Sequence, residues 1–213
     1  ALVIEKISEC QKLAFVPRES AGLTVIDDWA CLGQRTTASG TVLAENLVVE
    51  PFHLFPTWKS YATPTLAGPF AQLTTAAIDL GIARAALNDT VNFVSQFARP
   101  WIDASVERAS EDPLTIYHIG QLDSRLAAAD ALLERAGKVL DRYKYALSED
   151  NVAQASIAVA RAKVFTTEAA LEAASRLFEL SGTRSTSIAL NLDRHWRNGR
   201  VHTLHDPVRW KYQ

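Results

Sequence analysis

The feature that most constrains the fold is a long run of helix-forming sequence that begins near residue 65. It is rich in Ala and Leu and has no proline between Phe70 and Arg99. Its apolar residues recur every three to four positions, which is the period of a helix with one buried face. This stretch therefore predicts long helices that pack against one another along their apolar faces.

Proline, glycine and capping residues divide this stretch into four predicted helices. Pro113 favours a helix start because it fits the first turn, and Ser148 and Gly182 suit an N-cap and a C-cap. Short connections favour antiparallel neighbours, so we expect an antiparallel four-helix bundle. The predicted helices cover about 65–99, 113–147, 148–182 and 187–204.

Residues 1–60 have a different character, with more Val, Thr, Phe and turn residues. Their short apolar runs, separated by the turn-forming segments 17–22 and 36–40, are typical of antiparallel strands. The fold class is thus predicted as α+β, with a partial antiparallel β domain over 1–60 and a four-helix bundle domain over 61–213. The predicted strands lie within 2–4, 13–16, 23–26 and 42–49.

Composition narrows the functional classes. With 22 basic and 24 acidic residues the net charge is −2, which argues against nucleic acid as a partner. We see no signal peptide and no apolar run long enough to span a bilayer, so no membrane association is expected. Cys10 and Cys31 have no metal-binding spacing, which favours a reduced, cytoplasmic setting. The chain lacks Met and opens as if inside a strand, so we expect a fragment or a processed chain.

Three of the five histidines fall close to the C-terminus, at His195, His202 and His205. On a helix that ends before Pro207, His202 and His205 share one face and could look into one pocket with neighbouring arginines. Two other interpretations stay open. The imidazoles could cap the helix C-terminus, or they could form half of a metal site, although we find no third ligand and predict no metal.

A second cluster lies between the third and fourth predicted helices, in the sequence Ser-Gly-Thr-Arg-Ser-Thr from Ser181 to Thr186. It offers a glycine turn, hydroxyl groups and the Arg184 guanidinium, which are the groups that bind a phosphate. Because short glycine turns are common, this motif by itself is a weak indication.

Motifs spread over the whole chain resemble the acyl-CoA dehydrogenase superfamily. Residues 27–40 and 48–51 are similar to its middle β domain, and the helical remainder is similar to its C-terminal bundle. Five shorter motifs resemble the flavin-dependent monooxygenase branch of that superfamily, and most closely those of its members that act on organosulfur compounds. These motifs lie at 98–101, 111–113, 182–184, 193–198 and 202–207.

The resemblance implies a reduced-FMN-dependent monooxygenase that receives its flavin from a separate reductase. Oxygenation of a small organosulfur compound by O₂ would pass through a C4a-(hydro)peroxyflavin, with His202 and His205 holding and protonating the peroxide oxygen. The family's habit also implies a homo-oligomer, either a dimer or a tetramer.

The resemblance further assigns the flavin contacts. Trp29 corresponds to an aromatic residue near the flavin ring, and Arg99 and Arg184, with Gly182 and Thr183, are expected to bind its phosphate.

Two alternatives are retained. In an FAD-dependent acyl-CoA dehydrogenase a glutamate acts as the base, but the matching position here is Asp206, before Pro207, and Ser95 replaces an arginine that serves the FAD pyrophosphate. The other alternative is an inactive truncated fragment that only oligomerises.

Overall fold

The computed structural model describes residues 2–5 and 10–205, so the predicted roles of Asp206 and Pro207 lie outside the described residues. The chain forms two compact units. The first unit contains residues 1–31 and 35–65, and the second contains residues 32–34 and 66–213.

The first unit contains short antiparallel strands, as predicted. Strands β1 (Leu2–Glu5), β2 (Cys10–Ala14) and β5 (Leu54–Phe55) form one sheet in the order β1-β2-β5. Strands β3 (Leu23–Val25) and β4 (Val42–Ala44) form a separate pair, with Thr24 opposite Leu43.

The β-strand predictions missed β5 and made the run at 42–49 too long. The unit also contains η1 (Arg35–Thr37), η2 (Pro51–His53) and the four-residue helix α1 (Trp58–Tyr61). Ala14 is the only side chain described in this unit that is buried. The unit therefore has little apolar core of its own.

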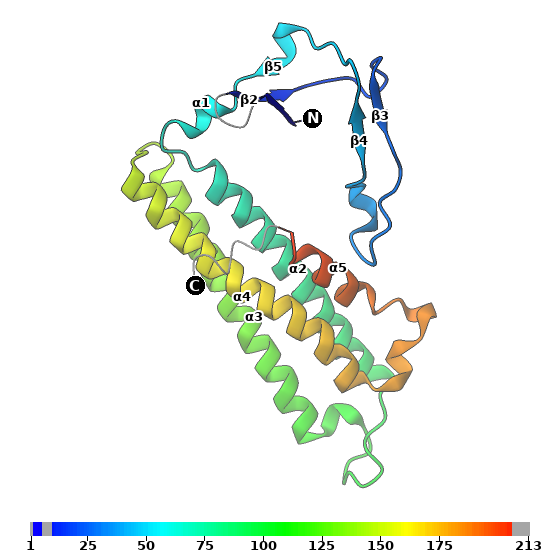
Figure 1. Ribbon diagram of the computed structural model, residues 1–213. Helices are drawn as coiled ribbons and strands as arrows, with labels where there is room; N and C mark the ends of the chain where they lie inside the picture. The colour runs from blue at the N-terminus through cyan, green and yellow to red at the C-terminus, as the bar shows by residue number, and fades with distance from the viewer. Residues whose placement is uncertain (1, 6–9, 206–213) are drawn as a thin grey trace. The chain divides into compact units, whose positions relative to one another are not determined.

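The second unit is built on three long helices, α2 (Ala67–Gln96), α3 (Pro113–Tyr143) and α4 (Glu149–Ser181). They run side by side with alternating direction, and the short helix α5 (Arg194–His202) packs on α2 and α4 (Figure 1). Among the described residues, none of the helices combines the length and hydropathy needed to cross a membrane.

The helix ends follow the predicted capping chemistry. The Asp112 carboxylate accepts a hydrogen bond of 2.8 Å from the Thr115 N–H, and Pro113 occupies the first position of α3. Ser148 caps α4 by accepting a bond from the Asn151 N–H. Gly182 ends α4 with a φ of 71°, a conformation that glycine adopts without steric cost. These local interactions explain why α3 and α4 begin where the sequence predicted.

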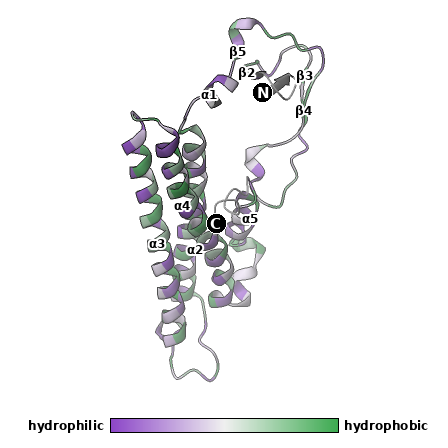
Figure 2. Ribbon diagram, turned by 60° about the vertical axis from the view of Figure 1, so that its left-hand side comes forward, coloured by the Kyte–Doolittle hydropathy of each residue, from purple (hydrophilic) through white to green (hydrophobic). Residues whose placement is uncertain are grey.

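The core of this unit lies between α2, α3 and α4, and polar and apolar residues occupy different positions along each helix (Figure 2). Leu80, Leu122 and Leu177 are almost completely buried, and each contributes about 1.5–3 kcal/mol by leaving water. Many other core positions of α2 and α4 are alanines, which allow the helix backbones to approach closely. The result is a close-packed scaffold that fixes the few polar side chains inside it.

The predicted fourth helix, 187–204, is wrong over its first half. That stretch contains the short turn η5 (Ile188–Leu190) and then Asn191 in the left-handed conformation with φ 49°, and α5 begins only at Arg194. A left-handed residue cannot continue an α-helix, and Asn tolerates that conformation better than most residues. The preceding segment forms another turn, η4 (Thr183–Thr186). The described part of this unit therefore contains three long α-helices and one α-helix of nine residues.

Candidate functional site

A cavity of about 910 Å³ lies at the end of the bundle where α2 and α4 both terminate. Its walls come from the segment that follows α2, from the start of α3, and from the end of α4 with η4. Arg99 from the first segment and Gly182, Thr183 and Arg184 from the last all line it. The fold thus brings Arg99 together with three predicted cofactor residues that lie more than eighty positions further along the chain, in a cavity of the size that small molecules occupy.

The cavity offers cations and one unused hydroxyl group. The Arg184 guanidinium lies 5.8 Å from the centre of the Phe97 ring, a cation–π contact that leaves its N–H groups available. Ser181 also lines the cavity, and its Oγ is the one buried side-chain polar atom among the described residues without a hydrogen-bond partner. A buried hydroxyl without a hydrogen-bond partner costs free energy, so the Ser181 hydroxyl is suited to bind a polar group of a ligand.

Acidic residues also line this cavity, but two of the three are occupied elsewhere. Asp112 caps α3, and the Glu179 carboxylate pairs with Arg176 at 3.3 Å. No carboxylate pairs with Arg99 or Arg184 in the part of the chain that the structure describes. Two such cations beside an unpaired hydroxyl suit an anion such as a phosphate.

Trp29, the fifth predicted cofactor residue, belongs to the first unit. Its side chain is half-buried in the segment between β3 and β4. A contact with a flavin ring therefore stays a prediction.

His202 takes part in a buried network that joins three helices. Its Nδ1 lies 2.5 Å from Oδ1 of Asp79 on α2. The other oxygen, Oδ2, accepts hydrogen bonds from Lys163 Nζ at 2.8 Å and Thr167 Oγ1 at 2.9 Å, both on α4. Asp79 is 0% exposed and Lys163 is 1% exposed. We call these four residues the Asp79 network.

The surroundings of Asp79 keep its carboxylate ionised. Burial by itself raises the pKa of Asp79, but hydrogen bonds from His202 and Lys163, together with the Lys163 charge, outweigh it and hold the pKa below its usual value. An ionised carboxylate only accepts hydrogen bonds, so His202 Nδ1 must carry a hydrogen. The other ring nitrogen, Nε2, has no hydrogen-bond partner among the described residues.

Sequence reasoning missed Asp79 and Lys163. The available signal was a charged residue inside an apolar helical run, since Asp79 lies between Ile78 and Leu80, and Lys163 lies between Ala162 and Val164. A charge at such a position is rarely buried unless it is paired. Nothing in the sequence identified the partners, because they are 84 positions apart.

A second aspartate–histidine pair joins α2 to α5. His195 Nε2 lies 2.7 Å from Asp89 Oδ2, and Arg194 Nη2 lies 2.6 Å from the same oxygen. His195 is buried, but Asp89 and Arg194 are partly open to solvent. We call Asp89 and His195 the Asp89 pair, and Arg194 is the second partner of the Asp89 carboxylate.

The predicted pocket with two imidazoles and several arginines is not formed as expected. The helix ends at His202, so His205 lies beyond it and is exposed, whereas the His202 ring turns inward to Asp79. The Arg197 guanidinium is occupied by the Asp193 carboxylate, by Asn191 Oδ1 and by the carbonyl of Leu32. The Asp193 carboxylate lies 2.7 Å from Arg197 Nε, one helical turn along the chain.

The cavity and His202 are far apart within one chain. Lys163, which shares Asp79 with His202, and Ser181, which lines the cavity, both lie on α4 and are separated by 18 positions. At about 1.5 Å per residue this separation is about 27 Å along the helix axis. One small ligand cannot contact both regions of a single chain.

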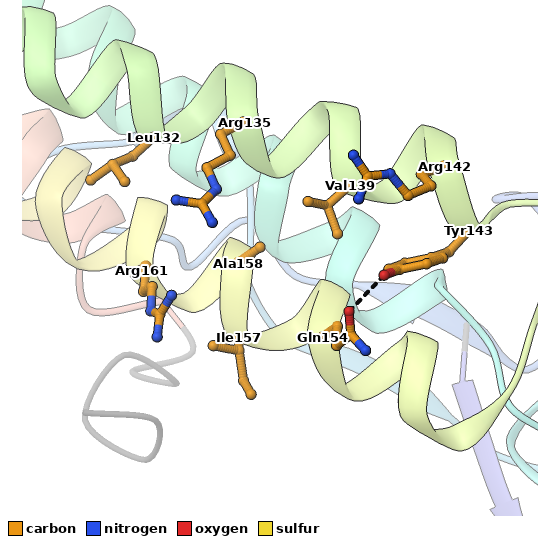
Figure 3. A pocket seen from close by; sticks show the side chains of 9 residues that line it. All are labelled: Leu132, Arg135, Val139, Arg142, Tyr143, Gln154, Ile157, Ala158 and Arg161. Carbon is orange, nitrogen blue, oxygen red and sulfur yellow. Dashed lines mark hydrogen bonds between the residues drawn. The ribbon is translucent and has the colours of Figure 1, made fainter.

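A smaller cavity of about 250 Å³ lies between α3 and α4 (Figure 3). Arg135, Arg142 and Arg161 stand around apolar side chains, and Tyr143 Oη donates a hydrogen bond of 2.6 Å to Gln154 Oε1. None of its lining residues is buried, and none belongs to the predicted site.

As for metals, the described residues contain no group of three His, Cys, Asp or Glu side chains that could hold an ion.

The fold and the cavity define a helical-bundle domain with an arginine-lined cavity at one end and a buried histidine network elsewhere. Residues 73–210 match the family described as acyl-CoA dehydrogenase, C-terminal domain. The chain belongs to that family.

Similar proteins include flavin-dependent enzymes. Dibenzothiophene monooxygenase from Mycolicibacterium goodii is 36% identical over 93% of this chain and 50% of its own length. The probable FMNH2-dependent monooxygenase SfnC from Pseudomonas putida is 35% identical over 93% of this chain and 52% of its own. The FMN-bound structure of TdsC from Paenibacillus sp. A11-2 superposes with a TM-score of 0.88 and 33% identity, covering 95% of this chain and 53% of TdsC. The chain thus spans about half the length of these relatives.

Proposed function

We propose that the full protein is a reduced-FMN-dependent monooxygenase that oxygenates a small organosulfur compound with O₂, and that a separate flavin reductase supplies the reduced flavin. The observation that carries this proposal is the cavity with Arg99, Ser181 and Arg184, found in a chain whose fold matches FMN-bound TdsC. The names of the similar enzymes support FMN and a sulfur-containing substrate.

The cavity fits the phosphate end of FMN. Arg99 and Arg184 would neutralise the phosphate, Ser181 Oγ would gain its missing partner, and the turn at Gly182 and Thr183 would bring backbone close to the ligand. FMN carries one phosphate group, which suits this single cluster of two arginines. When bound, the reduced flavin supplies the electrons that activate O₂.

His202 and His205 would act at the other end of the flavin. Imidazole exchanges a proton near neutral pH, so these side chains could hold and transfer a proton at the oxygen that reacts. Trp29 would contact the flavin ring. Residues 1–60 would be part of the family's β domain, and residues 61–213 would form the bundle domain, in which α5 is a short fourth helix.

The separation of about 27 Å between the cavity and the Asp79 network supports a site shared between copies. We infer a homo-oligomer, a dimer or a tetramer, in which the cavity of one copy binds the phosphate while the histidines of another copy face the reactive ring.

A cytoplasmic location is also proposed, supported by the free thiol of Cys31.

The first experiment is an anaerobic titration of the full-length protein with FMN, FAD and their reduced forms. We expect a preference for reduced FMN, and Arg99→Gln and Arg184→Gln should each weaken binding about 10- to 100-fold by removing charged hydrogen bonds. Arg125→Gln is the matched control, because Arg125 pairs with Glu172 and does not line the cavity. Tight FAD binding with bleaching by an acyl-CoA would instead identify a dehydrogenase.

The second experiment tests the shared site and the histidines. Arg184→Gln and His202→Ala proteins should each lose coupled oxygenation, and co-expression of the two should restore part of it, because a mixed oligomer contains intact pairs of half-sites. If the co-expressed proteins stay inactive, the shared site is wrong. His205→Ala with unchanged coupled oxygenation would remove His205 from the catalytic assignment.

A further inference from the structure

We propose that Asp79 is a positioning residue for His202. Its buried carboxylate holds the imidazole in one orientation and one tautomer, so that Nε2 is the nitrogen presented to the reaction. This inference rests on the proposed function, since it concerns the same histidine.

The geometry leaves little freedom to the ring. Asp79 Oδ1 lies 2.5 Å from His202 Nδ1, and the carboxylate cannot rotate easily because Lys163 and Thr167 hold its other oxygen at 2.8 and 2.9 Å. The three partners come from α4 and α5, and Asp79 itself lies on α2. The carboxylate is therefore fixed by one helix and used to orient a side chain on another.

Two features favour positioning over a purely stabilising role. A buried ion pair gains little net stability, because removing two charges from water costs about as much as their attraction returns. The network also assigns the His202 nitrogens unequally, since Nδ1 is used inside the bundle and Nε2 has no partner among the residues described. A carboxylate bound to Nδ1–H is the usual means of fixing a catalytic imidazole.

The test uses full-length protein and separates stability from orientation. In Asp79→Leu/Lys163→Met both buried charges are removed together, so no unpaired charge remains and the melting temperature should stay close to that of the wild type. In Asp79→Asn/Lys163→Met the charges are also removed, but a carbonyl oxygen stays near Nδ1. Asp89→Asn is the matched control, because Asp89 also binds a histidine of α5 but does not contact His202.

We expect Asp79→Leu/Lys163→Met to lower the product formed per flavin oxidised about 10- to 100-fold, by analogy with the loss of the hydrogen-bond partners that orient metal-bound histidines. Asp79→Asn/Lys163→Met should retain more of this coupling, because its carbonyl still accepts from Nδ1–H. Asp89→Asn should couple like the wild type, and flavin affinity should be unchanged in all three variants.

Coupling that follows the melting temperature across these variants, or stays at the wild-type level in Asp79→Leu/Lys163→Met, would overturn the positioning role. A wild-type protein that binds no reduced flavin and forms no oxygenated product would instead overturn the proposed function, and the positioning role would fall with it. The two failures are distinguishable because the second is seen before any variant is made.

Discussion

The Asp79 network and the Asp89 pair both join α2 to α5 through an aspartate and a histidine, but their surroundings differ. Asp79 is fully buried and binds Lys163 and Thr167 as well as His202. The Asp89 carboxylate is 28% exposed, and its second partner, Arg194, is 38% exposed. The aspartate–histidine pair of the Asp79 network is therefore isolated from solvent, whereas solvent screens the charges of the Asp89 pair.

This difference indicates that burial, more than the chemical groups, determines whether an aspartate–histidine pair is held in one fixed arrangement. In the partly exposed pair, water competes for the same hydrogen bonds and weakens the attraction between charges. In the buried network every hydrogen bond must be satisfied from within, so each partner is held in a single arrangement. The Asp89 pair would then anchor α5, and the Asp79 network would determine how its last residue is oriented.

The largest expected effect is that of Asp79→Ala. This change leaves the Lys163 ammonium buried without a counter-charge, and it should cost about 3–5 kcal/mol of stability. Unfolding in urea, compared with Asp89→Ala, measures it. Asp89→Ala should cost less, because the Arg194 cation that it leaves unpaired is partly open to water. Equal losses of stability in the two variants would contradict the role that we assign to burial.

The Asp79 network should also make stability depend on pH in acid, by a smaller amount. Because the pKa of Asp79 is lower in the folded protein than its ordinary value of 3.8, the contribution of Asp79 to stability is complete above that value and is lost as the pH falls through the folded pKa. Asp79→Leu/Lys163→Met should therefore lose less stability than the wild type between about pH 4 and pH 2. Thermal unfolding at several pH values measures this, and an equal fall of melting temperature with pH in the wild type and the variant would contradict the prediction.

Gly33→Ala should have an intermediate effect by disturbing the support of α5. A Cβ at this position would lie 2.1 Å from the Arg197 carbonyl oxygen, and the neighbouring Gln34 N–H donates to Asn198 Oδ1 at 2.8 Å. The backbone must shift, at a cost of about 1–3 kcal/mol. A melting temperature equal to that of the wild type would show that residues 32–34 do not constrain α5. Gly68→Ala is the control, because nothing lies within 4 Å of a Cβ there.

The smallest expected effect is that of Asp89→Asn, about 1 kcal/mol, because it removes a partly exposed ion pair with Arg194 and weakens one hydrogen bond to His195. The urea midpoint measures this loss. A loss as large as that of Asp79→Ala would show that exposure does not separate the two regions.

The sequence by itself determined the elements whose causes are local. Pro113, Ser148 and Gly182 act on their immediate neighbours, so the start of α3 and both ends of α4 could be predicted from them. The regular apolar period likewise predicted that these helices would share a core. Gly182–Arg184 form a local glycine-turn motif, but Arg99 could be grouped with them only through the family resemblance, because no local rule connects it to them.

Only the tertiary structure decided which polar residues meet. The left-handed Asn191 shortened the last helix and left His205 outside it. Packing of α2 against α4 and α5 brought Asp79, Lys163 and His202 together, although no spacing along the chain relates them. The physical reason is that helix period and caps depend on neighbours in sequence, whereas the burial and pairing of a charge depend on helices that come together only when the chain folds.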